Sequence, residues 1–120
     1  MKKTLVLGAS PNPTRYAYLA VQRLLSNGYE VVPLGIRKNA TIGELAILNG
    51  QPILDDIHTI TLYLNSSRQQ PYYDYMLSLK PSRIIFNPGT ENTELINLAK
   101  TKGIDTVIAC TLVMLSTNQY

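Results

Sequence analysis

Short apolar segments alternate with amphipathic segments along the whole chain. The apolar segments predict five strands, at residues 5–7, 31–34, 59–64, 83–86 and 106–109. Between them, apolar residues recur at helical spacing in three segments that begin near Thr14, Ser67 and Asn92. The inward-facing positions of these helices are Ala17, Ala20, Val21, Leu24, Leu25, Tyr72, Tyr75, Met76, Leu79, Leu95, Leu98 and Ala99. Strands that alternate with helices predict an α/β domain with a parallel sheet.

The pattern lapses between residues 35 and 56. Asn49-Gly50 lies there between two apolar segments, 46–48 and 52–54, which is typical of a hairpin turn. We expect this hairpin to replace a crossover helix between the second and third strands.

The composition of the strands predicts their places in the sheet. Residues 59–64 alternate polar and apolar, which indicates a half-exposed edge strand, whereas 83–86 and 106–109 are nearly continuous apolar runs that indicate coverage on both faces. With strands numbered along the chain, we expect a Rossmann-like open parallel sheet of about five strands, in an order near 3-2-1-4-5, with helices on both faces. Residues 1–120 form a single domain in this interpretation.

The first predicted strand breaks at Gly8 into the turn 9–13. Gly8 tolerates backbone angles closed to other residues, Asn12 suits a helix N-cap, and Pro13 suits the first helical position. Free N–H groups and the helix dipole would then favour an anion above this turn. The pattern indicates a nucleotide-type ligand, although any doubly wound domain needs a tight first turn.

Ligands of open parallel sheets bind beyond the carboxyl ends of the strands. The turns at these ends are 8–13, 35–38, 64–65, 87–89 and 110–111. After the second strand, where NAD-binding folds carry an acidic residue for the ribose, this chain has Arg37 and Lys38. Cations there disfavour NAD and favour a ribose with an extra phosphate, as in NADP or coenzyme A (CoA). A solvated basic pair on a loop explains them equally well.

Charge and rare residues narrow the functional classes. The chain has 11 Lys and Arg against 8 Asp and Glu, a net charge of +3, and no long basic run, which argues against nucleic acid as a partner. One Cys and one His give neither a disulfide framework nor a metal-ligand pattern. No apolar run has transmembrane length, so we expect a cytoplasmic protein with no membrane contact.

Several motifs together resemble the small stand-alone CoA-binding proteins, whose fold is similar to the N-terminal CoA-binding domain of the succinyl-CoA synthetase alpha subunit. These motifs are Val6-Leu7-Gly8-Ala9-Ser10-Pro11-Asn12-Pro13 with Tyr16, Val32-Pro33-Leu34-Gly35, the stretch 56–64, Phe86-Asn87-Pro88-Gly89-Thr90-Glu91-Asn92, and Ala109-Cys110-Thr111.

The resemblance implies that CoA or an acyl-CoA lies across the strand ends. The turn 9–13 would hold phosphate, residues 34–38 the phosphorylated ribose or adenine, and the later turns the remaining walls. The candidate binding residues are Gly8, Ala9, Ser10, Pro11, Asn12, Pro13, Arg15, Tyr16, Leu34, Gly35, Arg37, Lys38, Leu64, Asn65, Asn87, Pro88, Gly89 and Cys110. Cys110 either approaches the thiol of CoA or is a small buried side chain.

The residues indicate binding without catalysis. The synthetase uses a phosphorylated histidine in a second domain, which this chain has no room for, and His58 is expected at the amino end of its strand, away from the site. Ser10 has no neighbouring base. The alternatives are an NADP-dependent oxidoreductase and a module that senses a nucleotide or acyl-CoA. The apolar segment 110–116 is expected either to return over the sheet or to pack against another subunit, as in a homodimer.

Overall fold

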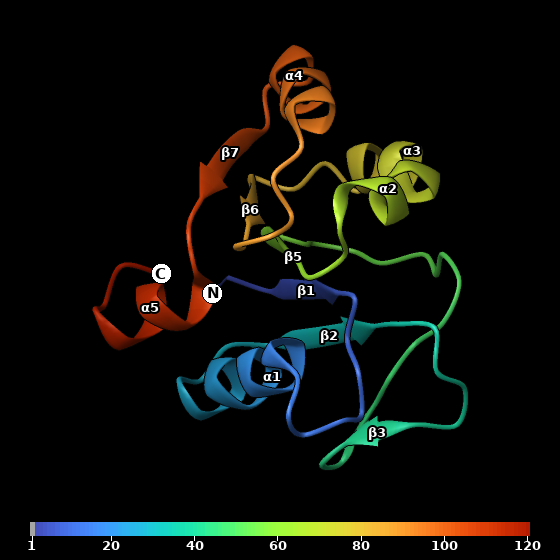
Figure 1. Cartoon of the computed structure of the whole chain (residues 1–120), viewed down its shortest axis with the longest axis vertical. Helices are drawn as coiled ribbons and strands as arrows, with labels where there is room; N and C mark the ends of the chain where they lie inside the picture. The colour runs from blue at the N-terminus through green and yellow to red at the C-terminus, as the bar shows by residue number, and fades with distance from the viewer. Residues whose placement is uncertain (1) are drawn as a thin grey trace.

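The computed structural model describes residues 2–120 and shows a parallel sheet between two layers of helices (Figure 1). The sheet contains β1 (Thr4–Leu7), β2 (Val31–Leu34), β5 (Thr59–Leu62), β6 (Arg83–Phe86) and β7 (Asp105–Ile108). A separate antiparallel hairpin contains β3 (Thr41–Ile42) and β4 (Leu45–Ala46). The helices are α1 (Tyr16–Ser26), α2 (Ser66–Gln69), the 3-10 helix η1 (Gln70–Tyr72), α3 (Tyr73–Ser78), α4 (Thr93–Thr101) and α5 (Thr111–Ser116).

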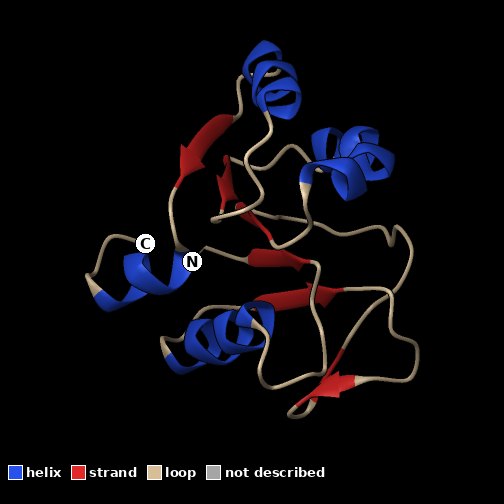
Figure 2. Cartoon of the chain, viewed as in Figure 1, coloured by secondary structure: helices blue, strands red, loops and turns tan. Residues whose placement is uncertain are grey.

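Each face of the sheet has its own apolar core, because successive strand residues point to opposite faces. Helices α3 and α4 cover one face, where Met76 and Leu95 pack with Ile60 and Phe86. Helices α1 and α5 cover the other face (Figure 2), where residues of α1 pack with Val6. The α/β fold with an open parallel sheet and helices on both faces, predicted from the sequence, is confirmed.

The order of the strands differs from the expected one. The sheet runs β2-β1-β5-β6-β7, which is 2-1-3-4-5 when only its own strands are numbered, so the expected order near 3-2-1-4-5 is wrong for the third strand. The place beside β2 is taken instead by Leu48, which forms an isolated parallel bridge with Leu34. The third strand, β5, therefore pairs with the opposite side of β1.

The interpretation of 83–86 as a strand covered on both faces is confirmed by β6, whose Ile84, Ile85 and Phe86 are buried, but the interpretations of 59–64 and 106–109 are wrong. Strand β5 is central, and its threonines are buried because they have partners: Thr61 Oγ1 lies 2.8 Å from Thr111 Oγ1, and Arg83 Nε donates to Thr59 Oγ1 at 2.9 Å. The apolar strand β7 is an edge strand, and Ile108 is 64% exposed. Hydrogen bonding can make a polar position a core position, which alternation of residue types does not reveal.

The expected hairpin around Asn49-Gly50 is also wrong. The hairpin of the structure turns at Gly43 and Glu44, between β3 and β4. The side-chain amide of Asn49 instead donates to the carbonyl oxygens of Gly35 and Arg37, at 2.8 and 3.0 Å. Asn49 therefore braces the turn that follows β2.

The first helix begins later than expected. Its N-cap is Arg15, without a side-chain cap, and α1 starts at Tyr16, so the expected capping role of Asn12 and the N1 position of Pro13 are wrong. Asn12 Oδ1 accepts from the backbone N–H of Thr14 at 3.0 Å, which is a local turn that precedes the helix. This turn competes with capping because it uses the same side-chain oxygen.

The second helical segment begins at Ser66, and its cap lies two residues before the expected cap Ser67. Asn65 caps α2 by accepting from the backbone N–H of Arg68 at 3.1 Å. Asn92 caps α4 as expected, and Gly28 and Gly103 have positive φ just beyond α1 and α4. Two expected inward positions are wrong, because Leu25 and Leu98 are exposed.

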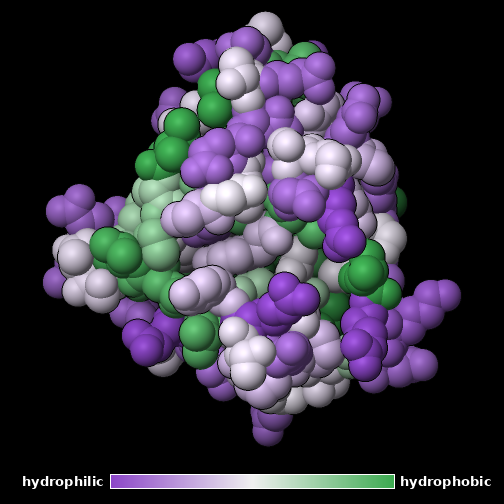
Figure 3. Space-filling model, viewed as in Figure 1, coloured by the Kyte–Doolittle hydropathy of each residue, from purple (hydrophilic) through white to green (hydrophobic). Residues whose placement is uncertain are grey.

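The C-terminal segment returns over the sheet as a helix, which is one of the two expected arrangements. Helix α5 contacts α1, and its Leu115 is buried while Val113 is 56% exposed. Hydrophobic residues gather on the side of the molecule formed by β7 and α5 (Figure 3, green). Contact between two copies through this segment stays a prediction.

Candidate functional site

A cavity of about 1050 Å³ lies at the carboxyl ends of four strands, β1, β2, β5 and β6. Its volume is at the upper end of the range of about 300 to 1,000 Å³ for small-molecule sites. The order 2-1-3-4-5 puts the reversal of the chain between β1 and β5, which is where such sheets bind ligands. The lining residues are Leu7, Gly8, Ala9, Ser10, Pro11, Thr14, Arg15, Tyr16, Ala17, Leu34, Gly35, Ile36, Arg37, Tyr63, Leu64, Asn65, Ser67, Arg68, Pro71, Tyr72, Pro88, Gly89 and Thr90.

Two glycines allow the loops of the cavity floor to approach one another closely. Gly8 has a φ of +100°, and a Cβ atom there would lie 2.9 Å from the carbonyl carbon of Tyr63. A Cβ atom at Gly35 would lie 2.2 Å from the carbonyl oxygen of Ala9. Neither position can carry a side chain unless the floor moves.

The backbone N–H groups of the first turn are mostly used within the protein. Those of Gly8 and Ala9 donate to the carbonyl oxygen of Leu34, at 2.9 and 3.0 Å. The expected phosphate cradle therefore does not consist of these groups. Tyr16 and Ala17 do line the cavity, and as the first residues of α1 their N–H groups have no partner within the helix.

Three arginines line the cavity: Arg15 before α1, Arg37 after β2, and Arg68 in α2. Within residues 2–120, their side chains form no hydrogen bond or ion pair, and no Asp or Glu is among the residues that line this cavity. A guanidinium offers several N–H donors and matches phosphate oxygens in pairs. This end of the molecule is therefore suited to a ligand with phosphate groups.

The two basic residues after β2, Arg37 and Lys38, differ in their position relative to the cavity. Arg37 lines the cavity, whereas its neighbour Lys38 does not. Asn49 fixes this turn by donating to Gly35 and Arg37, and Asn39, with a φ of +55°, follows it directly. The turn thus presents one of the two cations to the cavity.

Most of the candidate residues lie at the cavity, but Asn12, Pro13, Lys38, Asn87 and Cys110 do not line it. Asn87 is buried and fully engaged: its amide nitrogen donates to Thr61 and Leu62, and its amide oxygen accepts from the backbone N–H of Thr111 at 2.8 Å. Asn87 joins β5, β6 and the start of α5, so its role in the structure is to hold these elements together.

Cys110 is half-buried at the start of α5, after the edge strand β7. Strand β6 separates β7 from β5, and the cavity lies at the ends of β6 and of the strands beyond it. The structure does not place the thiol among the lining residues, and a role for it with the thiol of CoA stays a prediction.

Tyr63 lies in the cavity wall, and its hydroxyl is buried without a hydrogen-bond partner among residues 2–120. Burial raises the pKa of Tyr63 to about 12. The phenol therefore stays protonated at neutral pH and can donate a hydrogen bond but not act as a base.

Four residues of α2 and η1 line the cavity without being among the candidates predicted from the sequence. The sequence predicts Ser67 as a helix cap and Tyr72 as a core position, and it gives no role to Arg68 and Pro71. The signal that could have found them is Asn65, which ends the β5 segment and caps α2. A helix that starts at the carboxyl end of a central strand places its first turn at the crevice.

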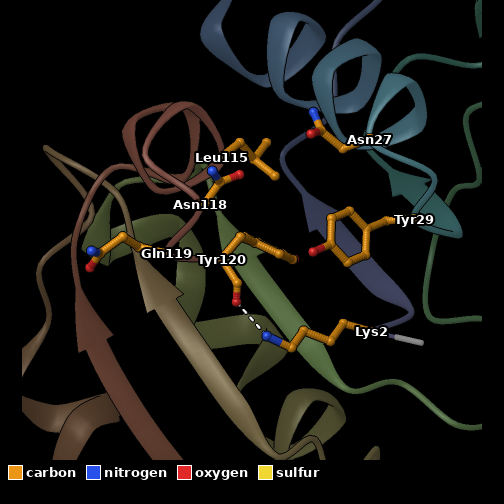
Figure 4. Close-up of a pocket in the computed structure, with 7 residues that line it drawn as sticks. All are labelled: Lys2, Asn27, Tyr29, Leu115, Asn118, Gln119 and Tyr120. Atoms are coloured by element: carbon orange, nitrogen blue, oxygen red, sulfur yellow. Dashed lines mark hydrogen bonds between the residues drawn. The ribbon is translucent and has the colours of Figure 1, made fainter.

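A second, smaller cavity of about 430 Å³ lies at the opposite end of the sheet (Figure 4). Its lining residues are Lys2, Asn27, Tyr29, Leu115, Asn118, Gln119 and Tyr120. Its one cationic lining residue, Lys2, donates to the carbonyl oxygen of Tyr120. His58 lies at this end too, as expected, and burial, followed by the charges of Arg83 and Lys2, lowers its pKa.

A protein-family model described as a CoA binding domain matches residues 2–116. The chain belongs to the CoA binding domain family. The resemblance stated from its motifs is thereby confirmed. No curated protein matches the chain.

Solved structures share the fold of this CoA binding domain. A crystal structure of an uncharacterized protein is 52% identical, with a TM-score of 0.96, and the match covers 100% of this chain and 98% of that one. A hypothetical protein from Pyrococcus horikoshii is 25% identical, with a TM-score of 0.85, over 97% of this chain and 82% of that one. A protein from Thermus thermophilus is 23% identical, with a TM-score of 0.84, over 99% and 90% of the two chains, and shows likeness of fold alone.

Within residues 2–120, no group of three or more His, Cys, Asp or Glu side chains could hold a metal ion. None of the helices described is both long enough and apolar enough to span a membrane.

Proposed function

We propose that this CoA binding domain binds CoA or an acyl-CoA in the large cavity and catalyses no reaction on it. The observation that carries the proposal is the set of three arginines, Arg15, Arg37 and Arg68, which line one cavity free of Asp and Glu in a chain of this family. CoA is an anionic ligand whose phosphates lie at two separate places, the pyrophosphate and the 3′-phosphate of the ribose.

The order of the strands supports this assignment. β1 lies between β2 and β5, so the segments that carry Arg37, Arg15 and Arg68 follow three strands that lie side by side. Cations contributed by three separate segments suit a ligand with several phosphates better than a single phosphate. The first turn of α1 adds N–H donors and the positive end of its dipole beside Arg15.

The lining residues support binding without catalysis. Among the lining residues, all within the described part of the chain, there is no His, Cys, Asp or Glu that could act as a base or nucleophile. The one phenol with a strongly raised pKa, that of Tyr63, keeps its proton at neutral pH. These properties suit a protein that holds its ligand unchanged.

The test is native mass spectrometry of the freshly purified protein, followed by calorimetry with CoA, dephospho-CoA, NADP and NAD under matched salt. We expect CoA to bind more tightly than NAD, and dephospho-CoA to bind more weakly than CoA. Absence of CoA binding up to millimolar concentration would remove the proposal. A preference for NADP would favour an oxidoreductase, because Arg37 could equally accept the 2′-phosphate of that cofactor.

The proposal extends to self-association through the C-terminal segment. Ile108 in β7 and Val113 in α5 are exposed apolar residues, at 64% and 56%, on the side where hydrophobic residues gather (Figure 3). Sedimentation of the wild type and Val113→Asp over a range of concentrations tests it. A wild type that stays monomeric at the highest concentration would rule out a homodimer there.

A further inference from the structure

We infer that Gln69 is a positioning residue for the ligand, because its buried amide ties together the two cavity loops that follow β5 and β6. The inference rests on the proposed function, since it concerns how the same cavity fits CoA. Gln69 does not line the cavity itself and would act only through the two loops.

The side chain of Gln69 is completely buried, although glutamine is a large polar residue. Burying an amide is costly unless its hydrogen-bonding groups are used. Its nitrogen donates to the carbonyl oxygens of Leu64 and Thr90, both at 2.8 Å, and its oxygen accepts from the amide nitrogen of Asn92 at 2.8 Å. Both amide hydrogens and the oxygen of Gln69 therefore have partners.

The two carbonyl groups belong to different walls of the cavity. Leu64 follows β5, Thr90 follows β6, and both residues line the cavity. One side chain thus spans the two loops and fixes the separation between them. Since its partners are both acceptors, only a group with two donors can hold them, which a carboxylate cannot do.

Asn92 holds Gln69 in turn. Its amide nitrogen donates to Gln69 Oε1 and to the hydroxyl of Tyr73, both at 2.8 Å, while its oxygen caps α4. We call the hydrogen bonds of Gln69 to Leu64, Thr90 and Asn92 the clamp. Through Asn92 the clamp is attached to α3 and α4 as well as to the two loops. A side chain anchored on this many elements has little freedom to follow a displaced loop.

The clamped side of the cavity differs in charge from the other side. The loop after β6 contributes Pro88, Gly89 and Thr90, none of which is charged, and the segment after β5 contributes one arginine, Arg68. The other two arginines, Arg15 and Arg37, come from the loops after β1 and β2. The uncharged wall after β6 suits the part of the ligand that carries no phosphate. Loss of the hydrogen bonds of Gln69 should therefore affect binding of that part and spare the contacts of Arg15 and Arg37 to the phosphates.

The experiment compares wild type, Gln69→Leu and Gln69→Glu with two probes, CoA and adenosine 3′,5′-bisphosphate, which keeps the 3′-phosphate and the first phosphate of the pyrophosphate but lacks the second phosphate and the uncharged arm of CoA. We expect Gln69→Leu to bind CoA about tenfold more weakly and the bisphosphate with less than about a twofold change. Gln69→Glu should bind CoA more weakly at pH 8 than at pH 5.5 relative to wild type, because a protonated carboxyl recovers one of the two donors. Tyr120→Phe, altered at the opposite end of the sheet, controls for a general loss of stability.

Amide hydrogen exchange of the ligand-free proteins separates this inference from the proposed function. Faster exchange at residues 64, 65, 89 and 90 in Gln69→Leu, and not in Tyr120→Phe, is the expected result. Unchanged exchange at these residues, or equal weakening of both probes, would overturn the positioning role. If the wild type binds no CoA, the proposed function is removed. The amide exchange at residues 64, 65, 89 and 90 then decides on its own whether Gln69 holds the two loops. If Gln69→Leu does not fold, Gln69→Glu, which has the same shape, is used for both measurements.

Discussion

The two ends of the sheet both carry cations and tyrosines, but use them in opposite ways. At the amino end, Lys2 and Arg83 donate to the carbonyl oxygen of Tyr120, and the Arg83 guanidinium lies 4.5 Å from the centre of its ring. Lys3 forms an ion pair with Glu30 at 3.6 Å. The cations of this end are already engaged by the protein.

At the carboxyl end the cations are left free. Within the described residues 2–120, the side chains of Arg15, Arg37 and Arg68 have no hydrogen bond or ion pair. The difference teaches that charge alone does not mark a site in this chain, because cations occur at both ends. The end that we propose as the binding site is the one where, among residues 2–120, the arginines lack partners and the loops of the cavity floor approach one another closely.

The largest effect is expected at the cavity floor, from Gly8→Val. A branched side chain there meets a φ of +100° and a Cβ contact of 2.9 Å with Tyr63, so we expect a loss of about 4 kcal/mol in unfolding free energy. Urea unfolding measures it, and calorimetry of the folded fraction should show no CoA binding.

Gly28→Val is the matched control at the other end of the sheet. Gly28 has a φ of +84° with no atom within 4 Å of an added Cβ, so only the strain of about 2 kcal/mol applies. Equal losses for the two variants, or normal CoA binding by Gly8→Val, would mean that the close approach at Gly8 is not what shapes the site.

The amino end should contribute to stability and not to binding. Tyr120→Ala removes a buried ring that packs against Tyr29 and Arg83, and we expect it to lower the unfolding free energy by about 3 kcal/mol. Calorimetry below the unfolding transition should give the wild-type CoA affinity. A changed affinity would contradict the division of roles between the two ends.

At the carboxyl end, Arg37→Gln should weaken CoA binding by about tenfold, because it removes a charge-assisted contact from a partly open loop. Lys38→Gln, altered at the neighbouring position outside the cavity, should have a much smaller effect. Titration with CoA and dephospho-CoA decides between specific contact and general charge. If Arg37→Gln reduces the affinity for CoA and for dephospho-CoA by the same factor, Arg37 does not contact the 3′-phosphate.

The smallest effect is the pH dependence at His58. Burial and the charges of Arg83 and Lys2 lower the pKa of His58 below 6.5, so the unfolded chain takes up the proton first as the pH falls. The free energy of unfolding is therefore unaffected by the titration of His58 above about pH 6.5, and it decreases as the pH falls from there through the lowered pKa. Unfolding free energies from pH 5 to 8 should show this slope, and His58→Gln should remove it. If the pH dependence of the unfolding free energy persists in His58→Gln, it arises from another titratable group.

The sequence was sufficient for several local elements and for the family, but not for the caps of the first two helices or for the place of the hairpin. The segments 31–34 and 83–86 are strands with the expected bounds, and Asn92 caps its helix, because each depends on neighbours within a few residues. The CoA binding domain family followed from several motifs together, although no single motif was specific. The large cavity lies at the carboxyl ends of the strands, where the sequence predicts the site, and the binding of a ligand there stays a prediction.

Most of the larger errors depend on contacts between distant residues. The burial of Thr61 rests on Thr111, fifty residues away, so its strand was expected at an edge. The bridge from Leu48 to Leu34, which displaces the third strand, has no local pattern either. The same holds for Gln69, whose partners Thr90 and Asn92 lie 21 and 23 residues further along the chain.

The bridge at Leu48 also determines how this sheet could polymerise. On the β2 border, Pro33 has no N–H to offer a further strand, and its carbonyl oxygen already accepts from the N–H of Leu48 at 2.9 Å. On the other border, β7 has no neighbour beyond it in residues 2–120. Only the β7 edge of the sheet can therefore pair with a strand of another molecule. If two copies pair through their β7 strands, no free edge is left for a third copy, so strand addition would give a dimer and not an open fibre.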